Sequence, residues 1–447
     1  MTRHQIDPRQ FSDSDLARHL LTVRGVQWMN GDRGAPLALL LRDHGVDPHT
    51  LHATLRGTPV LRQTDLDVWV TACHEPAAAL LADPRLTSQD TALGRRRRRV
   101  YSLGAGATVK YVLTVDDTAL AADHADSARS AELTRDWLSG PAVERHRART
   151  AAAFTGLALP DGERDAFDLL TDFVRPGTVA ALAGLLGLPP GSVERYAALL
   201  PATTHVLDSL LCPPTLAAGR ALVEGYDGIA ALVDQALAAP PELPDGALAG
   251  LLRAAGGDTA PVRSVALLTL VVGARLATGL ACSTVAALLA HPDEWDAVRR
   301  EPARAEAAVA ETLRYDPPVR VVGRIAGEAM EIAGLPIAAG DLVTVLVDAA
   351  QRDPAAHPEP DRFLPGRTAG AAPLVFADPR ISLLEPVVRL VATEAVRVLV
   401  ARRPRLTPAG EPVRHIRVPV TGAVARFPVR TAGRTAATQD GAVAAPR

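Results

Sequence analysis

Two stretches in the second half of the chain decide the fold. Residues 311–324 read ETLRYDPPVRVVGR, and residues 351–363 read QRDPAAHPEPDRF. In the first stretch, Glu311 and Arg314 stand at i and i+3 of a predicted helix, so the carboxylate and the guanidinium share one face and can pair. Alone, such a pair is typical of a solvated helix surface. The prolines that stop this helix and the ordered segments that follow make the pattern far more specific.

The composition around these stretches is that of a helical, globular chain. The protein has 447 residues, a formal net charge of −2, 48% hydrophobic and 22% charged residues, which excludes a wholly disordered chain. The near-neutral charge argues against a nucleic-acid partner, which calls for a basic excess. Only 4% of the residues are aromatic, so Ala, Leu and Val must form the core. This composition favours close-packed helices.

The hydrophobic pattern predicts mainly helices, with a small strand-rich lobe. Strands are expected within 58–71 and 319–347, and an ordered loop at 353–368. Helices are expected at 161–186, 193–211, 216–239, 262–289, 292–300, 302–315 and 385–402. The apolar run 265–290 contains Arg275, whose charge is costly inside a bilayer. It is therefore interpreted as a buried core helix, and a membrane span is the disfavoured alternative.

The chain shows neither repeats nor a flexible linker, which predicts one large domain. We expect an N-terminal helical segment at 1–57, the main domain at 58–430 and a disordered tail at 431–447. Three isolated cysteines and the absence of an apolar signal segment indicate a cytoplasmic protein. The pair His49 and His52 has no third ligand nearby, so no metal site is expected. The arginine run 95–99 is interpreted as a solvated loop, with an acidic partner patch as the alternative.

The ordered series around Glu311 resembles the haem-thiolate monooxygenase family, cytochrome P-450, in its bacterial soluble branch. The resemblance runs from about residue 58 to residue 428. It implies a cytochrome P-450-like fold in which Glu311, Arg314 and Arg362 form a buried structural triad. A bidentate contact between arginine and carboxylate suits such a lock between a helix and a loop.

The segment that should carry the iron ligand departs from the family. Residues 375–386, called here the ligand-position loop, read VFADPRISLLEP and contain no cysteine, histidine or glycine. Ser382 or Leu383 takes the ligand position, and neither side chain replaces the cysteine thiolate that the family's iron needs. The sequence therefore predicts the P-450-like fold without its haem-ligand cysteine.

Two further positions agree with this loss. The oxygen-handling groove of the central helix reads VGARLA at 272–277, without the family's acid and alcohol. Val143 takes the place of the family's histidine in the H-x-x-x-R helix, although Arg147 matches its arginine. Arg324 matches a propionate-binding arginine and is interpreted as a relic of the fold or a residual anion site. The sequence predicts no catalytic residue, no cofactor and no metal site.

The whole layout is similar to haem-free, P-450-like auxiliary proteins encoded with deoxysugar glycosyltransferases in macrolide and anthracycline pathways. Residues 26–32, VQWMNGD, resemble their N-terminal part. The resemblance implies a non-catalytic partner that activates or stabilises a glycosyltransferase acting on a nucleotide-activated deoxysugar and a polyketide aglycone. The alternative is an enzyme with another haem ligand or unrelated chemistry in the pocket.

The N-terminal helix is the predicted partner interface. Ser12 and Asp15 form a capping box that starts it. The candidate contacts are an apolar stripe on this helix, formed by Leu16, Leu20 and Val23, and Trp28 in the segment 26–32. Packing of the same residues on the protein's own core is the competing interpretation.

Overall fold

A long apolar helix forms the centre of the fold. It continues without a break through α13 (Thr259–Leu267), a π-helical segment (Leu268–Gly273) and α14 (Ala274–Ala290). By length and hydropathy it would suit a membrane, but 89% of its most apolar window is buried inside the protein. This is the expected core helix, and the π-helical segment within it is a feature that the periodicity did not predict.

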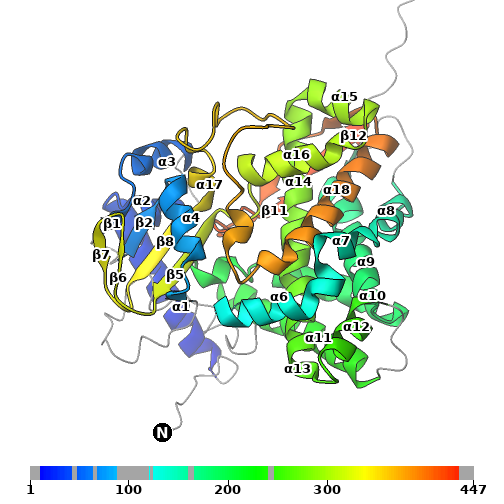
Figure 1. Cartoon of the computed structure of the whole chain (residues 1–447), viewed down its shortest axis with the longest axis horizontal. Coiled ribbons are helices and arrows are strands. Elements are labelled where there is room, and N and C mark those ends of the chain that lie inside the picture. Colours follow the sequence, from blue (N-terminus) through cyan, green and yellow to red (C-terminus); the bar gives the residue numbers. More distant parts are fainter. Residues whose placement is uncertain are drawn as a thin grey trace, which may run out of the picture.

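Most of the remaining helices surround this centre (Figure 1). The computed structural model describes residues 11–42, 48–63, 68–87, 120, 124–159, 166–239 and 246–431. The central α14 contacts α16 and α18, and these two also contact each other. The helices of this lobe are α6 (His124–Leu138), α7 (Gly140–Glu144), α8 (Arg147–Thr155), α9 (Arg175–Leu186), α10 (Pro190–Leu199), α11 (Leu216–Ala238), α12 (Ala247–Ala254), α15 (Pro292–Arg300), α16 (Arg304–Tyr315) and α18 (Glu385–Arg402).

A small sheet lies to one side of the helices (Figure 1). Its strand order is β1-β2-β8-β5-β3, and β2 and β8 are parallel while the other neighbours are antiparallel. The strands are β1 (Leu61–Gln63), β2 (Val68–Thr71), β3 (Leu86–Thr87), β5 (Val321–Ala326) and β8 (Leu342–Leu346). The short helices beside it are α2 (Pro36–Arg42), α3 (Pro48–Arg56), α4 (His74–Ala82) and α17 (Val347–Ala350). This confirms the predicted strand-rich lobe.

Three smaller strand groups complete the fold. A hairpin joins β6 (Met330–Ile332) to β7 (Leu335–Ile337), with positive φ at both turn residues, Ala333 and Gly334, as tight hairpins prefer. A second hairpin pairs β10 (Val413–Arg414) with β11 (Val424–Arg426). The third group has the order β4 (Ala166–Asp168), β12 (Pro428–Thr431), β9 (Leu406–Pro408).

Two of the predicted helices differ from the structure. Residues 161–186 were expected to be one helix, but β4 pairs with β12 here, then a π-helical segment (Leu170–Val174) precedes α9. The helix predicted at 193–211 ends at Leu199 and continues as short 3₁₀ turns. Pro201 explains this ending, because its missing N–H and its ring interrupt an α-helical ladder.

The N-terminal helix α1 (Asp13–Asp32) begins as predicted. Ser12 accepts a hydrogen bond from the backbone N–H of Asp15 and donates its hydroxyl to the Asp15 carboxylate. The helix packs against α2 and α11. The Gln27 amide donates to the carbonyl of Leu211, 2.9 Å away. The arginine run 95–99 and all but Thr431 of the tail expected at 431–447 lie outside the described residues.

Candidate functional site

The ligand-position loop carries a buried ion cluster instead of an iron ligand. Asp378 of this loop pairs with Arg324 of β5 and with Arg380, whose Nη2 lies 2.7 Å from the second carboxylate oxygen. The side chains of Arg324 and Asp378 are 2% exposed and that of Arg380 is 7% exposed. Two buried guanidinium groups therefore share one carboxylate.

The electrostatics of this cluster are set by burial and by charge. Burial raises the pKa of Asp378, but the nearby Arg324 and Arg380 charges outweigh it and hold that pKa well below its usual range. Burial, together with repulsion from Arg380, lowers the pKa of Arg324 to about 10. The family resemblance assigned Arg324 to a haem propionate. In this chain the Arg324 guanidinium is already paired with the Asp378 carboxylate.

The space that a porphyrin needs is filled by side chains. A haem held by the ligand-position loop and facing the oxygen groove must lie between this loop and the central helix. Here Leu384 is fully buried, and its Cδ2 lies 3.5 Å from where a Cβ on Gly273 would stand. Beside the loop, a cavity lined in part by Gly323, Asp378 and Ile381 encloses about 20 Å³, room for roughly one water molecule. The residues present therefore do not fit a haem.

The side chains at the ligand position are also engaged elsewhere. Ser382 donates its hydroxyl to the Pro379 carbonyl at 3.2 Å, and Leu383 packs on the hydrophobic core. On α14, burial raises the pKa of the Cys282 thiol to about 12, so this cysteine stays protonated. Among the described residues, groups of His, Cys, Asp and Glu that could hold a metal are absent. His52 is buried near Asp348, and the side chain of His49 lies outside the described part.

An arginine stands in the former oxygen groove, within the electrostatic influence of the buried Asp208. Burial lowers the pKa of Arg275, which replaces the family's acid, and the charge of Asp208 opposes that shift. Asp208 is fully buried and accepts hydrogen bonds from the backbone N–H groups of Val420 and Thr421 and from the Thr421 hydroxyl. Burial nevertheless raises the pKa of Asp208 to about 6. These contacts fasten the β10–β11 connection to Asp208.

A second arginine that matches the family is also neutralised within the protein. Arg147 of α8 contacts Glu144 and Glu394, both at 2.7 Å. The Glu394 side chain on α18 is fully buried. Val143, at the histidine position, is 2% exposed and lies in the hydrophobic core. Arg147 and Arg324, the two arginines that match family positions, therefore both have carboxylate partners within this chain.

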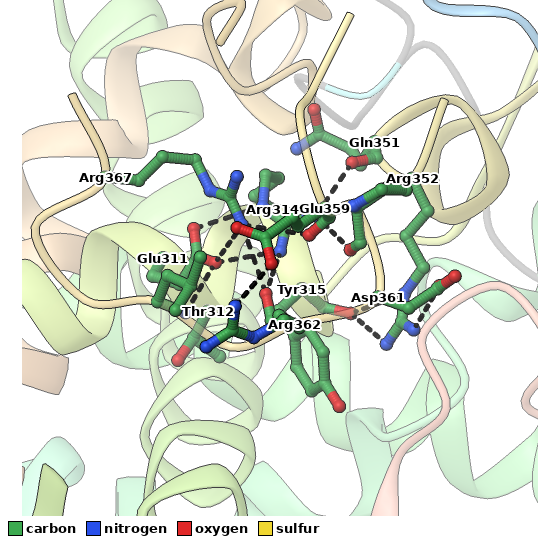
Figure 2. Close-up of polar contacts among 12 residues, drawn as sticks. Glu311, Thr312, Arg314, Tyr315, Gln351, Arg352, Glu359, Asp361, Arg362 and Arg367 are labelled. Atoms are coloured by element: carbon green, nitrogen blue, oxygen red, sulfur yellow. Dashed lines mark hydrogen bonds and ion pairs between the residues drawn. The ribbon is translucent and has the colours of Figure 1, made fainter. Parts of the chain in front are cut away.

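The predicted helix–loop lock exists, with one change of partner (Figure 2). Arg314 makes a bidentate contact with Glu311, with nitrogen–oxygen distances of 3.1 and 2.8 Å, and both side chains are 3% exposed. Arg314 also donates to backbone carbonyls of the loop, at Gln351, Pro360 and Arg362. This network holds α16 to the loop that follows α17.

The prediction that the Arg362 side chain completes this triad is wrong. That side chain is 64% exposed and pairs with Glu359. The third guanidinium belongs to Arg367, which is 11% exposed and contacts Glu311 at 3.4 Å. Arg362 contributes its backbone carbonyl, which accepts from Arg314 and Arg367. Figure 2 shows both arginines, 314 and 367, directed toward Glu311. The sequence carries no local signal that distinguishes Arg367 from Arg362.

The predicted partner residues divide between two faces of α1. Leu16, Leu20 and Val23 are 3–4% exposed, so they pack on the protein's own core. They offer no exposed stripe to a partner in this conformation. Trp28 is 43% exposed and lies on another face of the helix. Its role in an interface stays a prediction.

The comparisons with known proteins agree with this fold. The family model described as Cytochrome P450 matches residues 304–369, the region of the Glu311 lock. The ligand-free structure of CYP164A2 from Mycobacterium smegmatis superposes with a TM-score of 0.73 at 23% identity, covering 88% of this chain and 99% of that one. The protein therefore has the cytochrome P450 fold.

Two relatives are similar over nearly their whole length. Protein AknT of Streptomyces galilaeus is 39% identical over 432 residues, which cover 94% of this chain and 97% of AknT. Protein DesVIII of Streptomyces venezuelae is 33% identical over 414 residues, 92% of each chain. The chain belongs to their family, the cytochrome P450-like auxiliary proteins of antibiotic glycosyltransferases.

Proposed function

We propose that this chain is a non-catalytic, cytoplasmic auxiliary protein that binds a glycosyltransferase and activates or stabilises it. The partner transfers a nucleotide-activated deoxysugar to a polyketide aglycone. Membership of the family of AknT and DesVIII supports the partnership. The Asp378 cluster supports the absence of oxygenation, because it joins the ligand-position loop directly to Arg324.

The mechanism that fits these features is a shift in the partner's conformational equilibrium. A protein that binds one conformer of an enzyme more tightly raises the population of that conformer by its differential affinity. The auxiliary chain then needs a stable surface and no reactive group. The buried Glu311–Arg314 contact and the Asp378 cluster supply rigidity to such a surface.

The test is a glycosyltransferase assay with the co-encoded enzyme, in the presence and absence of this chain. We expect turnover, soluble yield or both to rise with the chain added. Comparing initial rates at equal concentrations of folded transferase separates activation from stabilisation. Unchanged rate and unchanged solubility would contradict the proposal.

A second measurement addresses the rival interpretation, an enzyme with another haem ligand. The chain is expressed with and without haem precursor and its visible absorption is recorded beside that of an active cytochrome P450. We expect no Soret band on the purified chain. A stoichiometric band would favour the rival interpretation.

A further inference from the structure

The exposed hydrophobic side chains gather in two segments. In the part of the chain that the structure describes, the large hydrophobic residues that stand exposed belong to α1 and to the β10–β11 hairpin. Their exposed fractions range from 43% at Trp28 to 77% at Ile416. They are Leu21, Trp28, Met29, Val413 and Ile416. Isolated exposed hydrophobics need no explanation, but a cluster on adjoining elements indicates a binding surface.

The two segments meet at one cleft. Trp28 of α1 and Ile416 of the hairpin both line a cavity of about 230 Å³, whose floor includes Leu41 and Cys212. Leu21 and Trp28 are separated by two helical turns, so they lie on the same face of α1. This face is separate from the one that buries Leu20. The helix is therefore apolar on two faces, and the outer one adjoins a cleft.

Trp28 is held in place before any partner arrives. The Arg42 guanidinium lies 3.8 Å from the centre of the Trp28 ring, in a cation–π contact. Arg42 is itself fixed by Asp32, at 2.7 Å. A preorganised tryptophan at the edge of a cleft is typical of a binding hot spot, because little side-chain entropy is lost when it is covered.

The cleft also carries positive charge that lacks a counterion. Within the described residues, Arg24 and Arg417 have no carboxylate partner, and Nη1 of Arg417 is buried without a hydrogen-bond acceptor. Burial and repulsion from Arg417 lower the pKa of Arg24. Arg417 has a φ of 63°, a backbone conformation that L residues rarely adopt. The chain thus keeps two guanidinium groups beside an apolar cleft and leaves their charges uncompensated.

We propose that this surface is where the glycosyltransferase docks, an inference that rests on the proposed function. The α1–hairpin surface is defined by Leu21, Arg24, Trp28, Met29, Ile416 and Arg417. Its occupant is a transferase segment that inserts an apolar side chain between Trp28 and Ile416 and presents a carboxylate to the two unpaired arginines. A second copy of this chain fits poorly, because a symmetric dimer would bring the same unpaired charges of both copies together.

Binding of surface variants to the co-encoded transferase tests the proposal. The full-length chain is titrated onto immobilised transferase at low and high salt, as wild type and as Trp28→Ala, Leu21→Asp and Arg24→Glu. We expect Trp28→Ala to raise Kd by at least about 30-fold, as at a hot spot. Arg24→Glu should raise Kd by about tenfold or more at low salt and flatten its salt dependence.

The matched control is Arg253→Glu on α12, an exposed arginine on another part of the molecule. It should bind as the wild type does. The unfolding midpoint of each variant is measured first. If Arg24→Glu lowers that midpoint, Leu21→Asp takes its place in the binding test, because Leu21 is 61% exposed.

The outcomes distinguish a failure of the proposed docking surface from a failure of the proposed function. If the wild type binds and stimulates the transferase while all three surface variants match it, the docking surface is wrong and the proposed function stands. If the wild type neither binds nor stimulates, both are wrong. Sedimentation of the isolated chain gives the third outcome: a dimer abolished by Trp28→Ala would overturn the proposal in favour of self-association.

Discussion

The Asp378→Asn substitution removes a charge from the cluster in the ligand-position loop and nearly keeps the shape of the side chain. Arg324 and Arg380 then stay buried with no carboxylate, at 2% and 7% exposure. Removing one partner of a buried ion pair costs about 3–5 kcal/mol, because the remaining charge is neither solvated nor paired. No discount for solvent screening applies at this burial. The free energy of unfolding of a typical protein is about 5–15 kcal/mol, so the loss is a large fraction of it.

Urea unfolding followed by far-ultraviolet circular dichroism measures this loss. With a slope of about 3 kcal/mol per molar urea, the midpoint of the variant falls by about 1–1.7 M. The control is Asp361→Asn, whose carboxylate is 76% exposed and pairs with Arg352 at 3.2 Å. An exposed pair contributes about 0–1 kcal/mol. A difference between the two variants below about 1 kcal/mol would refute the structural role of the Asp378 cluster.

The same substitution has a defined pH dependence. The neighbouring arginines hold the pKa of Asp378 below its usual range against the effect of burial. The folded state therefore keeps this carboxylate ionised at a pH at which the unfolded chain protonates it. The stability that Asp378 contributes is present above its ordinary pKa and is lost as the pH falls through the folded value. The difference in free energy of unfolding between the wild type and Asp378→Asn should persist at neutral pH and narrow only in strong acid.

Further outcomes are expected at three sites. Arg367→Ala should lower the free energy of unfolding by about 1–3 kcal/mol and the exposed Arg362→Ala by less than about 0.5; scanning fluorimetry giving the reverse order would restore Arg362 to the triad. Asp208→Ala should cost about 3 kcal/mol or more, since three hydrogen bonds lose their acceptor. Burial raises the pKa of Asp208 to about 6, so the wild type loses stability as this carboxyl group loses its proton between pH 5 and pH 7. Asp208→Asn should therefore lower the free energy of unfolding less at pH 7 than at pH 5, and equal losses at the two pH values would contradict this. Burial, more than nearby charges, lowers the pKa of His205 to about 4, so acidification from pH 6.5 to 4 should cost up to about 3 kcal/mol, and urea titrations should show a shallower acid decline in His205→Gln.

The parts of the fold that the sequence predicts correctly are those set by local physics. The helix at 262–289 follows from an apolar run with no proline, and the structure extends it to Thr259 and Ala290. In contrast, β4 exists because it pairs with β12, more than 250 residues further along the chain. A local helical pattern cannot report that partner, so the helix prediction was wrong at Ala166–Asp168, and its residues 161–165 lie outside the described part of the chain.

In the candidate site, too, the sequence predicts the contacts that local spacing sets and misses those that depend on distant parts of the chain. The spacing of Glu311 and Arg314 fixes their contact within one helix, and that part of the lock is confirmed. The choice between Arg362 and Arg367 depends on how a loop folds back, and spacing does not determine it. On α1 the periodicity is ambiguous for another reason. The helix has an inner apolar face that includes Leu20 and an outer one that includes Trp28, and only packing reveals which is buried.

Losing the iron-ligand cysteine and losing a free propionate-binding arginine are separate changes, and this chain carries both. A chain that lacked only the cysteine would leave Arg324 buried without an anion, which costs several kcal/mol. In this chain Asp378 supplies that anion from the same loop, and Leu384 fills the adjoining space against Gly273. Returning a cysteine to Ser382 or Leu383 alone would therefore not rebuild the site, because the propionate partner and the volume would still be occupied. The Asp378 carboxylate thus offsets, within the chain itself, the charge that Arg324 would otherwise leave unpaired.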